Sequence, residues 1–469
     1  MGYQKTLFIK ARLTFDCLSV SDACLDIMPQ KSRSVFSRII GNTGILITGR
    51  VLNAVCSFVY VAWTSQTLGL NLFGVMLLIT TFATLISDIT RFQSWQTLLH
   101  YGSKAFQEKD FNQFDDVLAF CIRADFFSAA IGMLVGLGGI LILGTSRLGW
   151  PAEVKPDALL CMLIILFMNI GWSTGMLRLC NRFKLVTIYE FITTCVRTGG
   201  CGIGYWLHMP LGYFLFIWCL TQFTLFVTCS YAGIYLFHQY TERAFPIRKI
   251  FQRKTPVEGM WKFTLSVSFN EILDSIFQQG GTLAIGSSLG AGEAAVYRVA
   301  RQISNGLSKP AQMMIPTLYP EFIRFRDQGD WHGMRLVTLK IFGLILGFSL
   351  LVFFLTVLVG ERLFTYMLHY SWPGEKTILV LLVCSALFDI CLVPIEPLLT
   401  VMKRISFVLK ARTAIIGCYF VFLYGMMRVA GINGAALSSV ISSFLMLIIC
   451  AIPVIKWFTR LSENDEGQS

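Results

Sequence analysis

The sequence predicts an all-α, polytopic integral membrane protein with about 12 transmembrane helices in two six-helix lobes. Three observations support this fold class: high overall hydropathy, regularly spaced apolar stretches, and a one-sided distribution of Lys and Arg. Of the 469 residues, 55% are hydrophobic and only 14% are charged, whereas soluble domains have about 25% charged residues. The mean hydropathy is +0.64. Hydropathy this high along the whole chain is typical of proteins that cross the membrane many times.

The apolar stretches each have about the 20 residues that a helix needs to cross the hydrocarbon core. Twelve are expected, at residues 43–66, 72–92, 117–144, 158–178, 186–207, 211–237, 263–287, 294–319, 336–359, 376–401, 405–427 and 434–456. They define a cytoplasmic tail (1–40), an N-terminal lobe (41–240), a cytoplasmic loop (241–262), a C-terminal lobe (263–457) and a second cytoplasmic tail (458–469). The third, ninth and eleventh stretches are almost entirely apolar, so we expect them to face lipid.

Lys and Arg concentrate on one side of this twelve-helix arrangement. If the N-terminal tail marks one side, 28 of the 39 Lys and Arg residues lie on that side and 5 on the other. Cytoplasmic loops carry the excess of Lys and Arg in inner membranes, so both termini are predicted to be cytoplasmic. The net charge of +12 is therefore a topology signal, and nucleic acid is not an expected partner.

The two halves of the chain resemble each other at the turn between their first and second stretches. Thr67-Leu68-Gly69 ends the first stretch and Ser288-Leu289-Gly290 ends the seventh, at an offset of 221 residues. Because six stretches precede the second copy, both copies enter the membrane in the same direction. The pattern predicts a parallel internal repeat, with the two lobes related by an axis along the membrane normal.

The stretch at 294–319 carries cations that a lipid-facing helix would not carry. At 100° per residue, its polar residues fall within about 120° of one another and run along roughly 21 Å of helix. They are Arg298, Arg301, Gln302, Asn305, Ser308, Lys309 and Gln312. A cation at the bilayer centre costs about 2.5–3.5 kcal/mol on insertion scales, so it needs water, a partner or a ligand. The stripe could line a wet cationic cavity or belong to a buried structural ion-pair network.

Polar residues also follow one face of the first, second and seventh stretches. We predict a substrate cavity between the lobes, lined by Arg50, Asn53, Arg298, Arg301, Asn305 and Lys309. The acids Asp88, Glu271, Asp274, Asp389 and Glu396 are expected to line it or to bind a coupling ion. Pro394 and Pro397 flank Glu396 and should kink the tenth helix.

Depth along the helices suggests which of these charges pair. Counted by helix rise, Asp274 and Lys309 lie at similar depth, whereas Arg298 and Arg301 lie farther toward the other side. We therefore expect Asp274 to pair with Lys309, which leaves the two arginines for an anionic ligand. Arg197 shares its helix with Glu190, and this pair is as compatible with a structural role as with a functional one.

Four short motifs can be compared with known families: Thr67-Leu68-Gly69, Phe73-Gly74, Val296-Tyr297-Arg298-Val299-Ala300 and Tyr319-Pro320-Glu321-Phe322. By these motifs the chain resembles, over about residues 41–457, the polysaccharide transporter (lipid-linked oligosaccharide flippase, Wzx-type) family of the multidrug/oligosaccharidyl-lipid/polysaccharide exporter superfamily. The chain departs from the family at Asn71 and Leu72, where acidic residues are common, and at Ser87–Arg91, where a Gly-containing end is usual.

The resemblance implies two lobes, alternating access and an undecaprenyl-pyrophosphate-linked oligosaccharide as the substrate. It also implies a place in O-antigen, capsule or exopolysaccharide biosynthesis at the inner (cytoplasmic) membrane, among membrane lipids, with a polysaccharide polymerase as a partner. Arginine forks suit a diphosphate, which fits this substrate.

Two other functions remain open at this point. A multidrug cation antiporter of the same superfamily would need an acidic, aromatic cavity, whereas cations are prominent here. A membrane-embedded glycan polymerase or transferase would need a large polar loop with catalytic carboxylates, and the longest loops have about 25 residues. The 14 Cys and 5 His show no zinc or haem spacing. We therefore expect no catalytic residues, no metal and no cofactor.

Overall fold

The computed structural model describes residues 35–466 except 148–149, 253–257, 313–314, 369–373 and 403. Some further side chains lie outside the described part, including those of Arg50 and Lys309. The chain divides into two units, residues 1–49 and 50–469. The description that follows concerns the second unit, whose N-terminal half ends with residue 241 and whose C-terminal half begins at residue 260.

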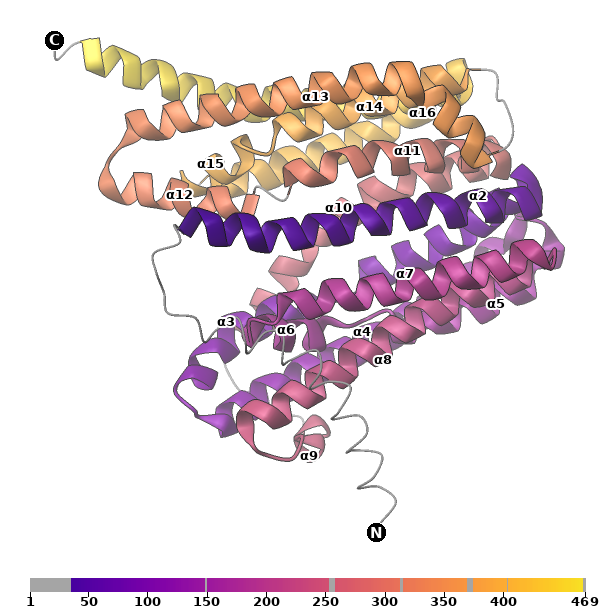
Figure 1. Ribbon diagram of the computed structural model, residues 1–469, viewed down its shortest axis with the longest axis horizontal. Helices are drawn as coiled ribbons and strands as arrows, with labels where there is room; N and C mark the ends of the chain where they lie inside the picture. Colours follow the sequence, from indigo (N-terminus) through magenta and orange to yellow (C-terminus); the bar gives the residue numbers. More distant parts are fainter. Residues whose placement is uncertain are drawn as a thin grey trace. The chain divides into compact units, whose positions relative to one another are not determined.

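The described residues form α-helices and short 3-10 turns and contain no strand (Figure 1). The N-terminal half contains α2 (Val35–Thr90), α3 (Ser94–Gln107), α4 (Phe111–Arg147), η1 (Ala152–Val154), α5 (Lys155–Met162), η2 (Leu163–Phe167), α6 (Gly171–Leu179), α7 (Phe183–Trp206) and α8 (Leu211–Thr241). After α9 (Ile247–Ile250), the C-terminal half contains α10 (Met260–Ser288), α11 (Ala291–Gln312), α12 (Ile315–Gln328), α13 (Trp331–Leu368), α14 (Glu375–Cys391), α15 (Ile395–Val401) and α16 (Ile405–Glu466). The predicted all-α fold class is confirmed.

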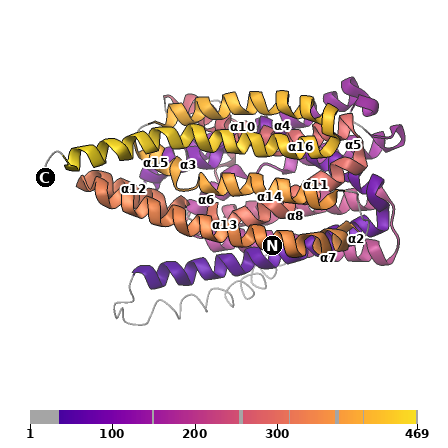
Figure 2. The same cartoon turned by 90° about the horizontal axis from the view of Figure 1, so that it is seen from above.

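Seven helical stretches in the described part are long and apolar enough to cross a membrane. Two of them contain a reversal of the chain. Gly69, with φ 71° and ψ 165°, interrupts α2, and Gly431, with φ 56° and ψ −135°, interrupts α16. Figure 2 shows the chain turning back within α16. Both glycines occupy positive-φ conformations that other residues rarely adopt, and both lie where the sequence predicts a turn between two helices.

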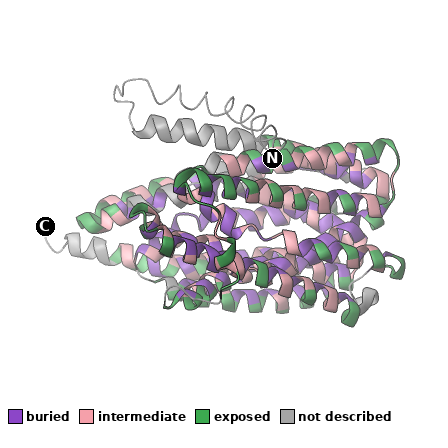
Figure 3. Cartoon of the chain, turned by 90° about the horizontal axis from the view of Figure 1, so that it is seen from below, coloured by how far each residue is buried: buried purple, intermediate pink, exposed green. Residues whose placement is uncertain are grey.

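Helices predicted to face lipid expose large apolar side chains. On α13, Phe354 and Leu358 are 62% and 76% exposed, and on α4, Phe126 and Ile142 are 71% and 84% exposed. Figure 3 shows exposed residues along the outer faces of the helices and buried residues between them. Water would disfavour apolar surfaces of this extent, so the fold defines a multi-pass membrane protein.

The prediction of one continuous helix at 158–178 is wrong. The chain there forms α5, the 3-10 turn η2 and α6, with a break at residues 168–170. Asp125 of α4 stabilises the break, because its Oδ2 accepts a hydrogen bond from the Trp172 backbone N–H at 2.7 Å. Asn169 Nδ2 donates to the backbone oxygen of Asp125 at 3.1 Å. The first contact replaces a helical hydrogen bond that the break removes, and the second holds the broken segment against α4.

The tenth stretch contains the predicted kink, whereas the segment after the second stretch contains a helix that was not predicted. The predicted kink at Pro394 is confirmed, since α14 ends at Cys391 and α15 begins at Ile395. The stretch predicted at 294–319 falls on α11 and the beginning of α12, and its residues 313–314 lie outside the described part. Helix α3 was not predicted, because it follows the second stretch without a hydrophobic span of its own.

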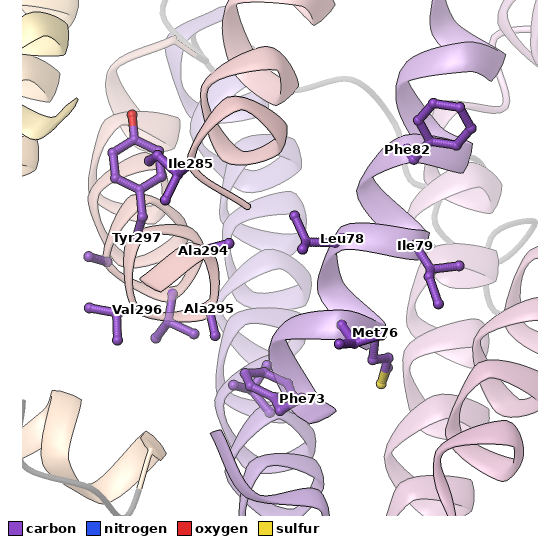
Figure 4. Packing of buried hydrophobic residues seen from close by; sticks show 14 of the residues in the cluster. Phe73, Met76, Leu78, Ile79, Phe82, Ile285, Ala294, Ala295, Val296 and Tyr297 are labelled. Atoms are coloured by element: carbon purple, nitrogen blue, oxygen red, sulfur yellow. The ribbon is translucent and has the colours of Figure 1, made fainter. Parts of the chain in front are cut away.

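The buried apolar residues of the described part form three clusters, and cluster 1 contains many residues from both halves. Cluster 1 includes Phe73, Leu78 and Trp150 of the N-terminal half together with Ala294 and Ile432 of the C-terminal half. In Figure 4, Leu78 points toward Ile285 and Ala294, while Ile79 points to the opposite side of α2. We call this end, which carries the turns at Gly69, Trp150 and Gly431, the closed end.

The other two clusters lie mainly within single halves. Cluster 2 extends from Leu98 to Phe237 and includes Met260 at the start of α10, whereas cluster 3 lies between Ala311 and Val454. Apolar packing therefore joins the two halves at the closed end. Elsewhere each half has mainly its own apolar core.

Candidate substrate cavity

Two neighbouring cavities bring the five predicted acids together. The first, about 170 Å³, lies between the end of α2 and α10 and is lined by Asp88, Arg91, Glu271, Asp274, Ser275, Gln278 and Gln279. The second, about 270 Å³, lies among α10, α14, α15 and α16, and its lining includes Asp274, Gln278, Asp389, Glu396, Arg412 and Ser443. Asp274 and Gln278 line both cavities. The acids meet because each lies on the polar face of an otherwise apolar helix.

Two arginines neutralise part of this acidic lining. Arg91 pairs with Asp88 at 2.9 Å, and the hydroxyl of Ser275 donates to the same carboxylate at 2.7 Å. Arg412 pairs with Glu396 at 2.8 Å and approaches Asp274 at 3.8 Å. Among the described residues, Asp389 and Glu271 have no cation within ion-pair distance. The cavities therefore keep a surplus of acidic groups.

The pairing predicted between Asp274 and Lys309 is not described, because the side chain of Lys309 lies outside the described part. The structure instead places Arg412 beside Asp274. Arg412 was missed by the sequence analysis, which counted it among the loop cations that define topology. Gln279 was missed as well, since an amide on a helix rich in polar residues gives no specific signal.

Arg298 and Arg301 lie on α11, where it packs against α10. Arg298 is half-buried, and its Nη1 donates to Gln279 Oε1 at 2.8 Å. Arg301 is only 6% exposed. Its Nη1 donates to the hydroxyl of Tyr297 at 2.8 Å, and its Nη2 donates to the backbone oxygen of Phe277 at 3.2 Å. In the described part of the chain, neither guanidinium pairs with a carboxylate.

These contacts bear on the two interpretations of the polar stripe. A structural ion-pair network would place an acid beside each arginine, and the described residues place neutral groups there. Arg301 is enclosed by its own half, with its guanidinium carbon 5.2 Å from the centre of the Phe277 ring. Arg298 keeps more N–H groups for another acceptor, since a guanidinium has five donors.

The neutral residues of the predicted cavity, Asn53 and Asn305, lie on α2 and α11. Asn305 Nδ2 donates to Gln278 Oε1 at 3.2 Å, which connects the α11 stripe to both acidic cavities. Asn53 of α2 has a buried Oδ1 without a hydrogen-bond partner in the described part. Gln302 Nε2 donates to Ser57 Oγ of α2 at 2.7 Å. Arg50, like Lys309, lies outside the described side chains. No group of three or more His, Cys, Asp or Glu residues in the described part is suited to a metal ion.

The fold is shared with solved transporters. The chain superimposes on a multidrug resistance MATE family transporter in its inward-facing conformation with a TM-score of 0.66 at 13% identity, covering 89% of this chain and 98% of that one. It superimposes equally well on the lipid II flippase MurJ in an inward closed conformation, with a TM-score of 0.66 at 13% identity over 90% of each chain. Fold and composition thus define a polytopic membrane protein that shares its fold with these two transporters.

The sequence matches the family model described as "Polysaccharide biosynthesis protein" over residues 39–326, which is more than half of the chain. The chain belongs to this family, and the resemblance noted in the sequence is confirmed. A curated relative, "Inner membrane protein YghQ" from Escherichia coli (strain K12), is 25% identical over 333 residues, covering 70% of this chain and 92% of the relative.

Proposed function

We propose that this protein moves a lipid-pyrophosphate-linked oligosaccharide from the cytoplasmic to the outer leaflet of the inner membrane by alternating access. The polysaccharide biosynthesis family and the fold shared with MurJ support a lipid-linked sugar as the substrate. The observation that carries the proposal is the placement of Arg298, which is half-buried on α11 and held by the neutral side chain of Gln279. A diphosphate would supply the counter-charge that the described residues do not.

The two predicted arginines then have different tasks. Arg298 contacts the diphosphate directly. The buried Arg301 attracts the diphosphate by its charge without contacting it, and holds α11 against α10 by its hydrogen bond to the Phe277 backbone oxygen. Asn53 and Asn305 offer hydrogen bonds to sugar hydroxyls, and Arg50 and Lys309 complete the proposed cationic surface. The acids Asp88, Glu271, Asp274, Asp389 and Glu396 face the same cavities and are proposed to bind a coupling cation or proton.

The direction of movement follows from the proposed topology. The Lys- and Arg-poor loops belong to the closed end, so this end would face outward and the cavities would open to the cytoplasm. Moving an anionic headgroup outward is then favoured by about 2.3 kcal/mol per charge for each 100 mV of membrane potential. The transported glycan would be delivered to a polysaccharide polymerase.

The test is surface glycan in a flippase-deficient strain complemented with each variant, together with the level of the protein in the membrane. Arg298→Gln should reduce surface glycan strongly at a normal protein level, and Arg298→Lys should recover little, because Lys cannot form a bidentate fork. As a matched control, Arg178→Gln changes an arginine of α6 that stacks on Trp95 outside the cavities. Normal glycan with Arg298→Gln would refute the proposal.

The surplus of acids in the two cavities favours a second candidate, a multidrug cation antiporter. Such a protein would confer resistance to cationic dyes, and Asp389→Asn or Glu271→Gln would abolish that resistance while Arg298→Gln would not. Dye resistance and surface glycan, measured on the same set of variants, distinguish the two functions.

A further inference from the structure

Arg197 of α7 does not form the pair that the sequence suggested. In the described part of the chain no carboxylate lies within ion-pair distance of it, and seven residues separate it from Glu190, which is about 10 Å along a helix. Its guanidinium carbon lies 4.2 Å from the centre of the Tyr60 ring on α2. Its Nε is buried and has no hydrogen-bond partner among the described residues. Arg197 is therefore a half-buried cation supported by an aromatic face.

A chain of polar contacts connects Arg197 to the stripe on α11. The hydroxyl of Ser57 donates to the Tyr60 hydroxyl at 3.1 Å and accepts from Gln302 of α11 at 2.7 Å. Gln302 lies one helical turn from Arg298. These contacts bring α7, α2 and α11, and thus both halves of the chain, to one place.

The charges of the two halves act on each other at this place. Arg298 lies within electrostatic range of Arg197, Arg301 and Tyr60. A cluster of like charges with neutral partners is unfavourable in a membrane unless an anion joins it. Neither Arg197 nor Arg298 uses more than one of its five N–H groups in a described hydrogen bond.

We propose that Arg197 and Arg298 bind one diphosphate between the two halves, with one guanidinium from α7 and the other from α11. This inference rests on the proposed function and adds a binding residue that neither the motifs nor the cavities indicated. Two planar forks on different helices each match a pair of phosphoryl oxygens. A diphosphate presents two such groups at once, whereas orthophosphate presents one.

The position of the site suggests how the ligand is released. Binding requires both guanidinium groups at the distance they have when the halves meet at the closed end. When the halves separate there, Arg197 and Arg298 move apart and each keeps only part of the contacts. The site therefore binds tightly in one conformation and weakly in the other without any competing ligand.

The experiment uses the full-length protein in nanodiscs, with inorganic pyrophosphate and orthophosphate as probes in isothermal titration calorimetry. Arg197→Gln should weaken pyrophosphate binding by about tenfold or more, the value of a hydrogen bond to a charged group. It should change orthophosphate binding much less, because orthophosphate reaches only one fork. Arg178→Gln is the matched control, since that arginine also stacks on an aromatic ring, with 3.8 Å between Cζ and the centre of Trp95, and it should leave both affinities unchanged.

Each outcome supports or overturns the inference. If Arg298→Gln loses pyrophosphate and Arg197→Gln does not, the bridging role of Arg197 is wrong while the proposed function stands. If wild-type protein binds no pyrophosphate, the anionic substrate itself is wrong. Equal weakening for both probes overturns the diphosphate bridge. Should Arg197→Gln fail to fold, Arg197→Lys keeps the charge, and wild-type pyrophosphate affinity in that variant refutes the fork.

Discussion

Replacing Arg412 by methionine tests whether the cation between the acids holds the C-terminal half together. Arg412 connects α16 to α15 through Glu396 at 2.8 Å and to α10 through Asp274 at 3.8 Å. Its Nη1 also donates to Asn270 Oδ1 at 3.4 Å. Methionine keeps most of the side-chain volume and removes the charge, so Glu396 loses its nearest cation.

The size of the effect follows from the exposure of the pair. The side chains of Arg412 and Glu396 are 23% and 27% exposed. Exposed pairs contribute about 0.2–1 kcal/mol, whereas removing one partner of a fully buried pair costs about 3–5 kcal/mol. A pair that is one-quarter exposed lies between these limits, so Arg412→Met should lower the free energy of unfolding by about 1–3 kcal/mol.

The assay is a double-mutant cycle on unfolding of the purified protein by SDS in mixed micelles. Adding Glu396→Gln to Arg412→Met should recover part of the loss, because the unpaired carboxylate is then neutral. Lys104→Met is the control, since Lys104 lies 3.9 Å from Glu108 in a pair whose side chains are 83% and 62% exposed, and its effect should stay within about 0.5 kcal/mol. If Arg412→Met is no more destabilising than Lys104→Met, the reasoning is refuted.

Three further predictions concern pairing, conformation and topology. Asp274→Asn should change the unfolding free energy by less than about 1 kcal/mol, because its carboxylate is 55% exposed and 3.8 Å from its cation; a loss of several kcal/mol would point to a second partner. Gly74→Val should open the closed end, since a Cβ at Gly74 would collide with the backbone carbonyl of Ala291 in the other half. Spin labels on opposite halves of that end should move apart, and an unchanged distance distribution would contradict the expectation. In a cysteine-free background, Phe251→Cys should be labelled from the cytoplasm and Glu153→Cys from outside, and the reverse pattern would refute the topology.

The helical segments could be predicted because membrane insertion imposes a strong constraint on sequence. A span must be apolar for about 20 residues, and every backbone group must find a partner inside the segment. In the described residues the predicted stretches fall largely on helices, except that the fourth is interrupted at residues 168–170 and the tenth at residues 392–394. The turns at Gly69 and Gly431 were also visible, since each glycine separates two apolar stretches.

The interruption of the fourth stretch could not be predicted in the same way. Its sequence is mostly apolar, with Asn169 as the polar residue at the break. The residue that stabilises the break, Asp125, lies on another helix. Such a break depends on a tertiary contact that replaces lost backbone hydrogen bonds. Hydropathy contains no information about that contact, because it describes each segment separately.

The acidic part of the candidate site was predictable, but its pairing was not. Carboxylates are costly in lipid, so Asp389 and Glu396 must face the interior of the protein. The polar face of α10 is the predicted polar surface there. The depth argument for Asp274 considered only cations inside the spans, and Arg412 was assigned to a loop. Arg412 nevertheless lies within the predicted stretch 405–427, and the structure places it in the lining of a cavity. Arg197 was missed for the opposite reason, since an acid on its own helix offered a sufficient partner.

The contacts between the two halves differ in kind at the two ends, and this difference suggests how the protein moves. At the closed end the halves share an apolar core and close backbone approaches. Away from that end they meet along one face of α10, where Thr264 contacts Thr97 at 2.9 Å, Ser268 accepts from the Gln93 backbone N–H at 2.9 Å, and Ser275 donates to Asp88 at 2.7 Å. Close apolar packing is lost when surfaces separate by even a small distance, whereas hydroxyl groups can rotate and keep their hydrogen bonds during a small change of angle. The polar line along α10 is therefore suited to remain as a hinge while the apolar contacts of the closed end break and form.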